Sequence, residues 1–381
     1  MNRFILKTVQ LFVVFVCIIS CKKTTSEMET KTIINCENAI YVDYKSVISK
    51  IEITELSNDE KAYMPGYKRL YVADSLYVFS DKKGIVYLFD NNGELLSNSR
   101  DKKGKGNGEY EICLAVTYNH YSGNVEIVTP VGIMMYDKNF NYVGMSAYKD
   151  KETQSLMFNY IYDISAHEHL LISPLPHDGN TSYLYIYDSK ERRITKKLPY
   201  DEGCPYITMQ EQCVSDDNFI AFPNMSYSFY HFDRENYELK QSVVLDFGKN
   251  SLAEKDISSL KDNNQRGRYL AAECNKALAL RTFKCGEKIV SIVKEGPERS
   301  DFRTYIVNLE RLKTQYLKYE YEDMKVPLFE AFKNNVLYAC VPENEVFYYI
   351  DKSLLDKKSL DILAKHTENS NFYIIKYYLT N

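Results

Sequence analysis

The sequence predicts an all-β protein, and three observations support this prediction. Short runs of β-branched and aromatic residues, bounded by turn residues, follow one another along most of the 381 residues, as expected of antiparallel strands. Tyr is abundant, with 34 residues, and aromatic side chains suit a pleated, half-buried surface. A motif of aromatic or aliphatic residues followed by a polar residue also returns along the chain. Together these features predict a six-bladed β-propeller of four-stranded antiparallel blades.

The repeated motif ends in Asp90, Asp137, Asp188 and Asp233, and its fifth copy ends in Asn308. The first four copies lie roughly 45–51 residues apart, and a period in the forties with four strands per repeat is typical of propeller blades. One meander cannot bury both of its faces alone, so the blades must stack around an axis. An insertion of about 28 residues explains the longer interval before the fifth copy.

The first blade is predicted within residues 69–110. Its strongest hairpin signal is Asn91-Asn92-Gly93, because a tight hairpin turn needs positive φ at its central residues. A glycine-rich segment, Gly104–Tyr110, ends the unit. It superficially resembles a phosphate-binding loop, but no helical pattern follows it. A turn with positive φ between two blades explains these glycines better.

The first 20 residues are predicted to be a lipoprotein signal peptide. Arg3 and Lys7 form its positive start, and the apolar run Val9–Ile19 is shorter than the roughly 20 residues that span a bilayer. The run ends in Ile-Ile-Ser-Cys21, which resembles the bacterial lipobox, so Cys21 is the expected lipidation site. An ordinary secretory signal with a chance cysteine is the alternative. Residues 21–45 are expected to form a flexible tether.

The propeller itself is predicted at residues 46–381. Ile51–Leu56 alternates apolar and polar residues but has no hairpin partner, so it is expected to become the fourth strand of blade six. The terminal run Phe372–Leu379 would be the third strand of that blade. Helical insertions are expected at about 251–276 and 343–366, both on one face over the mouth of the channel. They either bind a ligand or cap apolar surface.

Composition argues against nucleic-acid binding but does not decide whether the cysteines form disulfides. The net charge is −4, so there is no basic excess to bind nucleic acid. The locally feasible disulfides are Cys204–Cys213 and Cys274–Cys285, and the alternative is that these cysteines are small buried hydrophobic residues. The absence of Cys-x-x-Cys from the sequence gives a zinc or thioredoxin-like site no support.

The motifs for catalysis are weak. His167-Glu168-His169, with His177 and Asp178 nearby, could form a metal site, but an exposed turn is the preferred interpretation. There is no nucleophile elbow in the sequence. We therefore expect no catalytic residues, no metal and no other cofactor.

The candidate ligand-binding residues lie in and near the first insertion. Arg266, Arg268 and Tyr269 are in the insertion, while Glu298 and Arg299 are in a loop that should open on the same face. Arg offers a planar fork to acidic or hydroxyl groups, and Tyr offers an apolar body with a polar tip. A solvated helix surface is the alternative.

Several of these features together resemble the bacterial six-bladed β-propeller lipoproteins, a family similar in appearance to the NHL and TolB-like propellers. They are the lipobox, the closing strand, the glycine-rich segment and the terminal strand, and the likeness covers roughly residues 45–381. Asn107 and Phe372 stand where that family usually has proline. The resemblance implies that the protein is located in the cell envelope, at the periplasmic or surface side of the outer membrane. It implies no catalytic residues.

The sequence thus predicts a membrane-anchored, extracytoplasmic propeller that binds a small molecule, a glycan, a peptide or an envelope protein. A binding module is expected rather than an enzyme. The alternative function is that of an enzyme, a lyase or lactonase-like hydrolase with a metal in the central channel.

Overall fold

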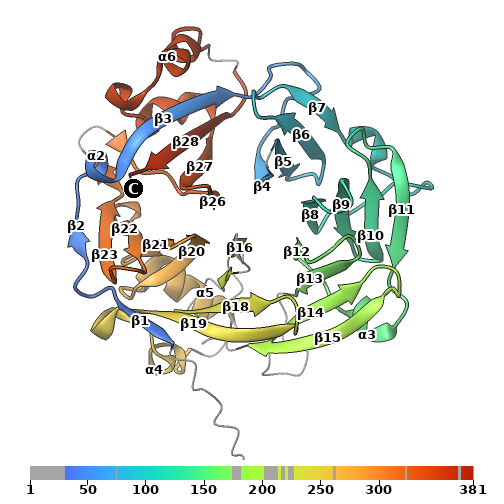
Figure 1. Ribbon diagram of the computed structural model, residues 1–381, viewed down its shortest axis with the longest axis horizontal. Coiled ribbons are helices and arrows are strands. Elements are labelled where there is room, and N and C mark those ends of the chain that lie inside the picture. The colour runs from blue at the N-terminus through green and yellow to red at the C-terminus, as the bar shows by residue number, and fades with distance from the viewer. Residues whose placement is uncertain are drawn as a thin grey trace, which may run out of the picture. The chain divides into compact units, whose positions relative to one another are not determined.

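Six antiparallel sheets follow one another around a ring (Figure 1), as the sequence predicts. They are found in a computed structural model that describes residues 31–73, 75–173, 182–200, 213–215, 219–221, 227–260, 263–321, 324–367 and 370–380. Apart from Thr32, all residues of the six sheets lie in the unit that begins at Ile33. The all-β, six-bladed fold is therefore confirmed.

Each blade contributes four consecutive strands, except for the last one. Blade one consists of β4 (Tyr67–Val72), β5 (Leu76–Asp81), β6 (Val86–Asp90) and β7 (Leu95–Asn98). Blade two consists of β8 (Ala115–Asn119), β9 (Asn124–Thr129), β10 (Gly132–Tyr136) and β11 (Tyr142–Ala147). Blade three consists of β12 (Tyr160–Asp163), β13 (Glu168–Ile172), β14 (Ser182–Asp188) and β15 (Arg193–Tyr200).

Blade four consists of β16 (Cys213–Ser215), β17 (Phe219–Ala221), β18 (Ser228–Asp233) and β19 (Glu238–Asp246). Blade five consists of β20 (Leu278–Cys285), β21 (Lys288–Lys294), β22 (Phe302–Asn308) and β23 (Lys313–Lys318). A small hairpin, β24 (Glu320–Tyr321) and β25 (Met324–Lys325), leads to blade six. Blade six consists of β26 (Ala331–Lys333), β27 (Val336–Val341), β28 (Tyr373–Leu379) and β3 (Ile48–Glu55).

The first strand of each blade lies nearest the centre of the ring and the fourth lies outermost (Figure 1). Because neighbouring strands are antiparallel, the second and fourth strands of every blade end on the same face of the ring. We name this the top face and the opposite one the bottom face. Both insertions and all connections between blades therefore start from the top face.

The ring is closed by the N-terminal strand, as predicted. β3 pairs with the C-terminal strand β28 in an antiparallel register that runs from Glu55 opposite Tyr373 to Ile48 opposite Leu379. Ile48, Ile51 and Ile53 are 0–2% exposed. This single pairing joins the two ends of the propeller and removes its open edge.

The segment expected to be a tether is structured from Thr32 onward, which corrects the boundary at residue 45. β1 (Thr32–Asn35) adds a fifth strand to blade four, and β2 (Ile40–Tyr41) pairs in parallel with β23 of blade five. Ile34 is 1% exposed. A short helix, α2 (Tyr44–Val47), then leads into β3. Edge strands this short have no alternation pattern to reveal them in the sequence.

The repeated acid of the sequence motif caps the hairpin between the third and fourth strands. Asp90 Oδ1 accepts hydrogen bonds from the backbone N–H groups of Asn92 (2.8 Å) and Glu94 (3.0 Å). Asp137, Asp188 and Asp233 accept backbone hydrogen bonds in the same way. Such side-chain bonds stabilise turns that the backbone alone would not hold. The repeat seen in the sequence thus reflects the hairpin turns that these acidic side chains cap.

The turn of blade one differs from the predicted one in a single detail. Gly93 has a positive φ of 88°, while Asn92 is not among the residues with positive φ. The strand register also shifts between Leu88 and Phe89. The hairpin is therefore a bulged turn with one left-handed residue instead of two.

The first insertion packs onto blade five. It contains α4 (Glu254–Ile257), α5 (Asn263–Arg268) and the π-helical turn η4 (Tyr269–Glu273). Its buried residues Leu252, Ile257, Leu270 and Cys274 form a cluster with Leu278 at the start of β20. This burial corresponds to the capping alternative for the apolar side chains of the insertion.

The second insertion contains η6 (Glu343–Tyr349), η7 (Lys352–Leu354) and α6 (Lys357–Ala364). It does not lie over the mouth of the channel as expected, because its later part runs along the outermost strand β3 (Figure 1). The backbone N–H of Ile53 donates a 3.0 Å hydrogen bond to Ser359 Oγ, and Leu355 forms a parallel bridge with Ile51. The insertion covers the edge of blade six.

The cysteines of the described residues form no disulfide. Cys36, Cys113, Cys274 and Cys340 are buried with free thiols, and Cys285 is half-buried and also free. The feasible pair Cys274–Cys285 is therefore wrong, because both residues pack as hydrophobic side chains. The side chains of Cys204 and Cys213 lie outside the described part of the chain.

Candidate functional site

A pocket of about 170 Å³ opens on the top face where blades five, six and one meet. Its aromatic lining comes from Tyr67 at the start of β4, Phe302 at the start of β22, Tyr319 after β23 and Tyr349 in η6. Aliphatic residues Leu328 and Val341 add apolar surface, and Glu330 and Glu345 supply the carboxylates. An apolar pocket with a few convergent polar groups is the usual form of a small-ligand site.

Glu330 is held in place on one wall of the pocket. Its Oε2 atom lies 2.9 Å from Arg281 Nη1, and its side chain is only 9% exposed. The hydroxyl of Tyr67 donates to Glu330 Oε1 at 3.1 Å and to the backbone oxygen of Cys340 at 2.9 Å. Arg281 also donates to the backbone oxygen of Phe329 at 3.0 Å. The ion pair and these hydrogen bonds link blades one, five and six and hold this wall of the pocket rigid.

Another part of the lining comes from η6, through Glu345 and Tyr349. The Tyr349 hydroxyl donates to Glu345 Oε2 at 3.1 Å, and the backbone oxygen of Tyr349 accepts from the buried Tyr377 hydroxyl at 2.7 Å. Burial raises the pKa of Tyr349, and so do the neighbouring Tyr319 and Glu345. The Tyr349 hydroxyl therefore stays protonated and can donate. Glu345 is half-buried, so its carboxylate can accept from a ligand.

A second, wider hollow of about 500 Å³ lies on blade one, beside residues 57–61 and 94–101. Its lining consists of Ser, Asp, Lys, Glu, Asn and Arg side chains with two leucines. Few apolar groups are present to bury a ligand there. The pocket between blades five, six and one is the better candidate.

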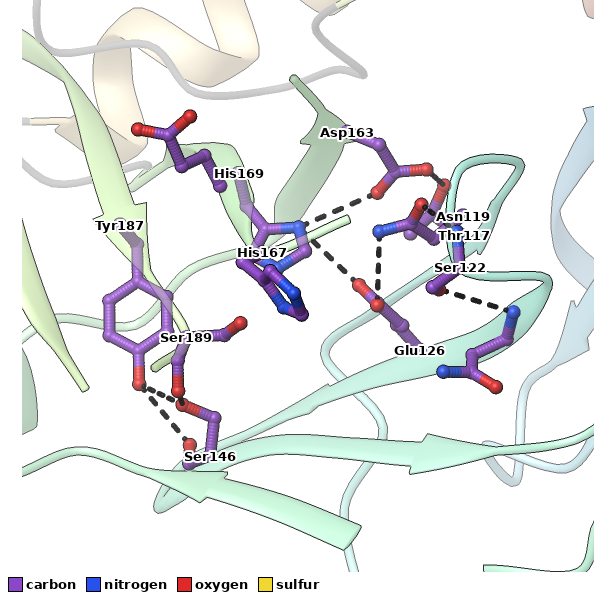
Figure 2. Close-up of polar contacts among 12 residues, drawn as sticks. Thr117, Asn119, Ser122, Glu126, Ser146, Asp163, His167, His169, Tyr187 and Ser189 are labelled. Carbon is purple, nitrogen blue, oxygen red and sulfur yellow. Dashed lines mark hydrogen bonds and ion pairs between the residues drawn. The ribbon is translucent and has the colours of Figure 1, made fainter. Parts of the chain in front are cut away.

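A separate polar centre lies between blades two and three (Figure 2). Its residues lie near the ends of first strands and the starts of second strands, which places the centre toward the bottom face. Glu126 is on β9, Asp163 ends β12, and His169 is on β13. Their side chains are 1–2% exposed. His169 Nδ1 lies 3.4 Å from Glu126 Oε2 and 3.5 Å from Asp163 Oδ1. Three groups that can carry charge thus converge inside the protein.

The protonation of this centre is strongly perturbed. Burial raises the pKa of Glu126 to about 7, and the nearby Asp163 carboxylate contributes to the rise. Burial opposes the charged form of His169, but the Asp163 and Glu126 carboxylates outweigh it and raise the pKa of His169. Perturbed pairs of this kind gather at functional sites, although structural ion pairs also produce them.

The predicted binding residues of the first insertion lie in different surroundings. Arg268 is exposed at the end of α5, and Arg266 is half-buried. Tyr269 is half-buried and packs against the cluster that contains Leu270 and Cys274. The body of Tyr269 is therefore used for packing.

The predicted residues of the second loop lie on the top face, as expected from its place between β21 and β22. Glu298 is exposed, and its backbone N–H donates to Asp301 Oδ2 at 2.9 Å. Arg299 begins the turn η5 (Arg299–Asp301), which leads directly into Phe302 of the pocket. Cys21 lies outside the described residues.

The predicted histidine cluster is divided. His167 is exposed in the turn before β13, whereas His169 is buried, so the two do not share a site. His177 and Asp178 lie outside the described residues. Glu126 and Asp163 were missed as partners of His169. The one signal in the sequence is the charged Glu126 inside the apolar run Val125–Val128, since a charge there must find a buried partner.

The six sheets around the ring, each with four antiparallel blade strands, define this chain as a six-bladed β-propeller. Residues 21–326 match the family DUF5128, which is described as a 6-bladed β-propeller, and the chain belongs to this family. No curated protein matches it in sequence. In the described residues, the helices are all too short or too polar to cross a membrane.

Two solved structures share the fold. One is a protein from Bacteroides fragilis described as exported, with a TM-score of 0.70, 12% identity and coverage of 92% of this chain and 100% of its own. The other is a member of the DUF4221 family from Bacteroides vulgatus, with a TM-score of 0.56, 9% identity and coverage of 88% and 97%. At such low identities the likeness extends to the fold alone.

Proposed function

We propose that this protein is a lipid-anchored, extracytoplasmic binding module that holds one sugar unit of a glycan in the pocket between blades five, six and one. The observation behind this proposal is the pocket itself, in which four aromatic residues and two carboxylates face one small volume. It rests on strands from three blades, and rigid scaffolds of this kind hold binding groups in place.

The lining favours a neutral, hydroxyl-rich ligand. Among the described residues, the lining of the pocket includes no Lys, Arg or His. Two nearby cations are already paired, Arg281 with Glu330 and Arg303 with Glu295. An anionic ligand would therefore meet two carboxylates without a counter-charge. The hydroxyls of a sugar can donate to Glu345, and its C–H faces can pack against aromatic rings.

The size of the pocket suits a single ring. A cavity of roughly 150 Å³ holds one benzene molecule, and this pocket has about 170 Å³. A sugar ring at the end or side of a longer chain would fill it, while the rest of the glycan would extend across the top face. The exposed Arg268 and Glu298 are proposed to contact that remainder.

Anchoring to the outer membrane through Cys21 is part of the proposal. The lipobox Ile-Ile-Ser-Cys21 supports it, and so does the family match, which begins at residue 21 and leaves out the signal segment. Two acyl signals give stable membrane attachment, whereas one chain gives only marginal binding. The linker between Cys21 and β1 would hold the propeller at the membrane surface.

Replacing the lipidated residue tests the anchor. Cys21→Ala should release the protein into the soluble fraction or leave it as the unprocessed precursor, because no acyl chain can be attached without the thiol. Fractionation of cells followed by metabolic labelling with a fatty acid measures both outcomes. A Cys21→Ala protein that is still processed, acylated and membrane-bound would exclude the proposed site.

Variants of the pocket test the binding role. A glycan array selects the best-bound glycan, and titration calorimetry then measures its Kd. Glu345→Gln should weaken binding about 10-fold, because it removes a charged acceptor but keeps the shape. Tyr319→Ala should weaken it further, because an aromatic packing surface is lost.

Two matched controls show where the ligand sits. His167→Ala, on the bottom face, should leave the Kd unchanged, and Arg268→Ala should have a smaller effect than Glu345→Gln. If Arg268→Ala abolishes binding while both pocket variants retain it, the site is on the first insertion. If the protein binds peptides but no glycan, the proposed ligand class is wrong.

A further inference from the structure

The centre between blades two and three has three buried atoms without hydrogen bonds that face one another. Glu126 Oε2, Asp163 Oδ1 and His169 Nδ1 have no hydrogen-bond partner in the described part of the chain. Each of the three residues offers one ligand atom, and these three atoms lie within 4.8 Å of one another. A buried polar atom without a partner costs about 1–3 kcal/mol, and more when it is charged. A bound group that contacts all three of these atoms at once would remove this energetic cost.

The distances suit a shared ion better than direct pairing. A charge-assisted N–H···O hydrogen bond is usually about 2.7–2.9 Å long, but His169 Nδ1 lies 3.4 and 3.5 Å from the two carboxylate oxygens. Zinc bound tetrahedrally, with metal–ligand distances of about 2.0–2.1 Å, separates neighbouring donor atoms by about 3.4 Å. The two spacings from His169 Nδ1 to the carboxylate oxygens correspond to edges of such a tetrahedron.

The remaining carboxylate oxygens are oriented by neighbours. Asn119 Nδ2 donates to Glu126 Oε1 at 3.1 Å, and Thr117 Oγ1 donates to Asp163 Oδ2 at 3.3 Å (Figure 2). Asn119 is itself fixed, since it also donates to the backbone oxygen of Ser165 at 3.2 Å. Partners that hold the outer side of each ligand are a regular feature of metal sites.

Charge favours a divalent ion. Two ionised carboxylates and a neutral imidazole together balance a 2+ charge. The nitrogen donor disfavours Ca²⁺ and Mg²⁺, which take oxygen ligands. A zinc-class ion with a water as fourth ligand fits this donor set.

We propose that Glu126, Asp163 and His169 bind one divalent cation of the zinc class, which ties blade two to blade three. Because all three side chains are buried, the ion holds the blades together and does not meet a substrate. The proposal is independent of the glycan pocket, which lies on other blades and near the opposite face.

Metal titration of the purified, chelator-treated protein tests the proposal. The wild type should bind one Zn²⁺ per chain by calorimetry and melt at a higher temperature with Zn²⁺ than without it. Glu126→Gln and His169→Gln should each weaken Zn²⁺ binding by at least ~100-fold. His167→Ala, two residues away and exposed, should bind as the wild type does. Unchanged Zn²⁺ binding in both ligand variants would overturn the proposal.

X-ray absorption of the zinc-loaded wild type keeps the test decisive if the variants fail to fold. The proposed site gives only nitrogen and oxygen neighbours at about 2.0–2.1 Å, whereas a site built from the free cysteines gives sulfur at about 2.3 Å. One bound ion with an N/O shell supports the proposal. A wild type that binds no Zn²⁺, or binds it through sulfur, would show that the centre is a metal-free group of paired side chains.

Discussion

Removal of residues 22–55 should abolish cooperative folding, because it deletes the strand that closes the ring. β3 supplies the fourth strand of blade six and covers β28 along its whole length. Its three buried isoleucines each contribute about 2–5 kcal/mol, estimated from core substitutions to alanine. Their sum, on the order of 6–15 kcal/mol, equals the entire net stability of a typical domain, about 5–15 kcal/mol.

Two shorter truncations provide the controls. Removing residues 22–30 should leave the melting temperature unchanged, since β1 begins only at Thr32. Removing residues 22–41 also deletes β1 and β2, and with them the buried Ile34, so it should lower the melting temperature without preventing folding. Differential scanning calorimetry and circular dichroism measure all three. Equal melting temperatures for the 22–30 and 22–55 truncations would mean that the ring closes without β3.

Gly93→Ala should be the most damaging single substitution in the hairpin turns. A Cβ atom at Gly93 would lie 2.0 Å from the backbone oxygen of Glu55 and 3.0 Å from Thr54 Cγ2, both in β3. A backbone oxygen cannot turn away as a side chain can, so the turn or the closing strand must shift. The left-handed φ costs about 1–2 kcal/mol and the overpacking about 1–3 kcal/mol, which gives a loss of about 2–5 kcal/mol.

Gly123→Ala is the matched control. Gly123 has a similar φ of 74°, but an added Cβ would meet only the Tyr118 hydroxyl at 3.9 Å. This substitution should cost only the backbone term, about 1–2 kcal/mol. Urea denaturation of both variants gives the comparison. Similar losses at the two positions would show that contact with β3 contributes nothing to the effect of Gly93→Ala.

The sequence predicts the propeller because its repeated features are local. The acid at Asp90 and its equivalents bonds to backbone only a few residues away, so the turn chemistry is visible in a short window. The closing strand is visible for the same reason, since Ile51–Leu56 alternates over its own length. The outer strands β1 and β2 are too short to show any period, and they were expected to be a tether.

The two candidate sites could not be predicted because their residues meet only in space. Tyr67 and Glu330 come from opposite ends of the ring's sequence and touch because β3 closes it. Glu126 and His169 belong to different blades, and no local pattern sets the distance between them. The direction of the second insertion likewise depends on a contact between Ser359 and Ile53, which is set by packing against the edge of blade six.

The proposed binding site is tested most directly by hydrogen exchange with and without a bound glycan. If the pocket holds the sugar, backbone amides in residues 319–321, 328–330 and 343–349 should be protected when the glycan is added, because the ligand covers these segments and restricts their opening. Amides of the turn 165–168 on the bottom face should exchange at the same rate in both samples. Protection confined to that turn, or to residues 263–273 of the first insertion, would contradict the assignment of the pocket.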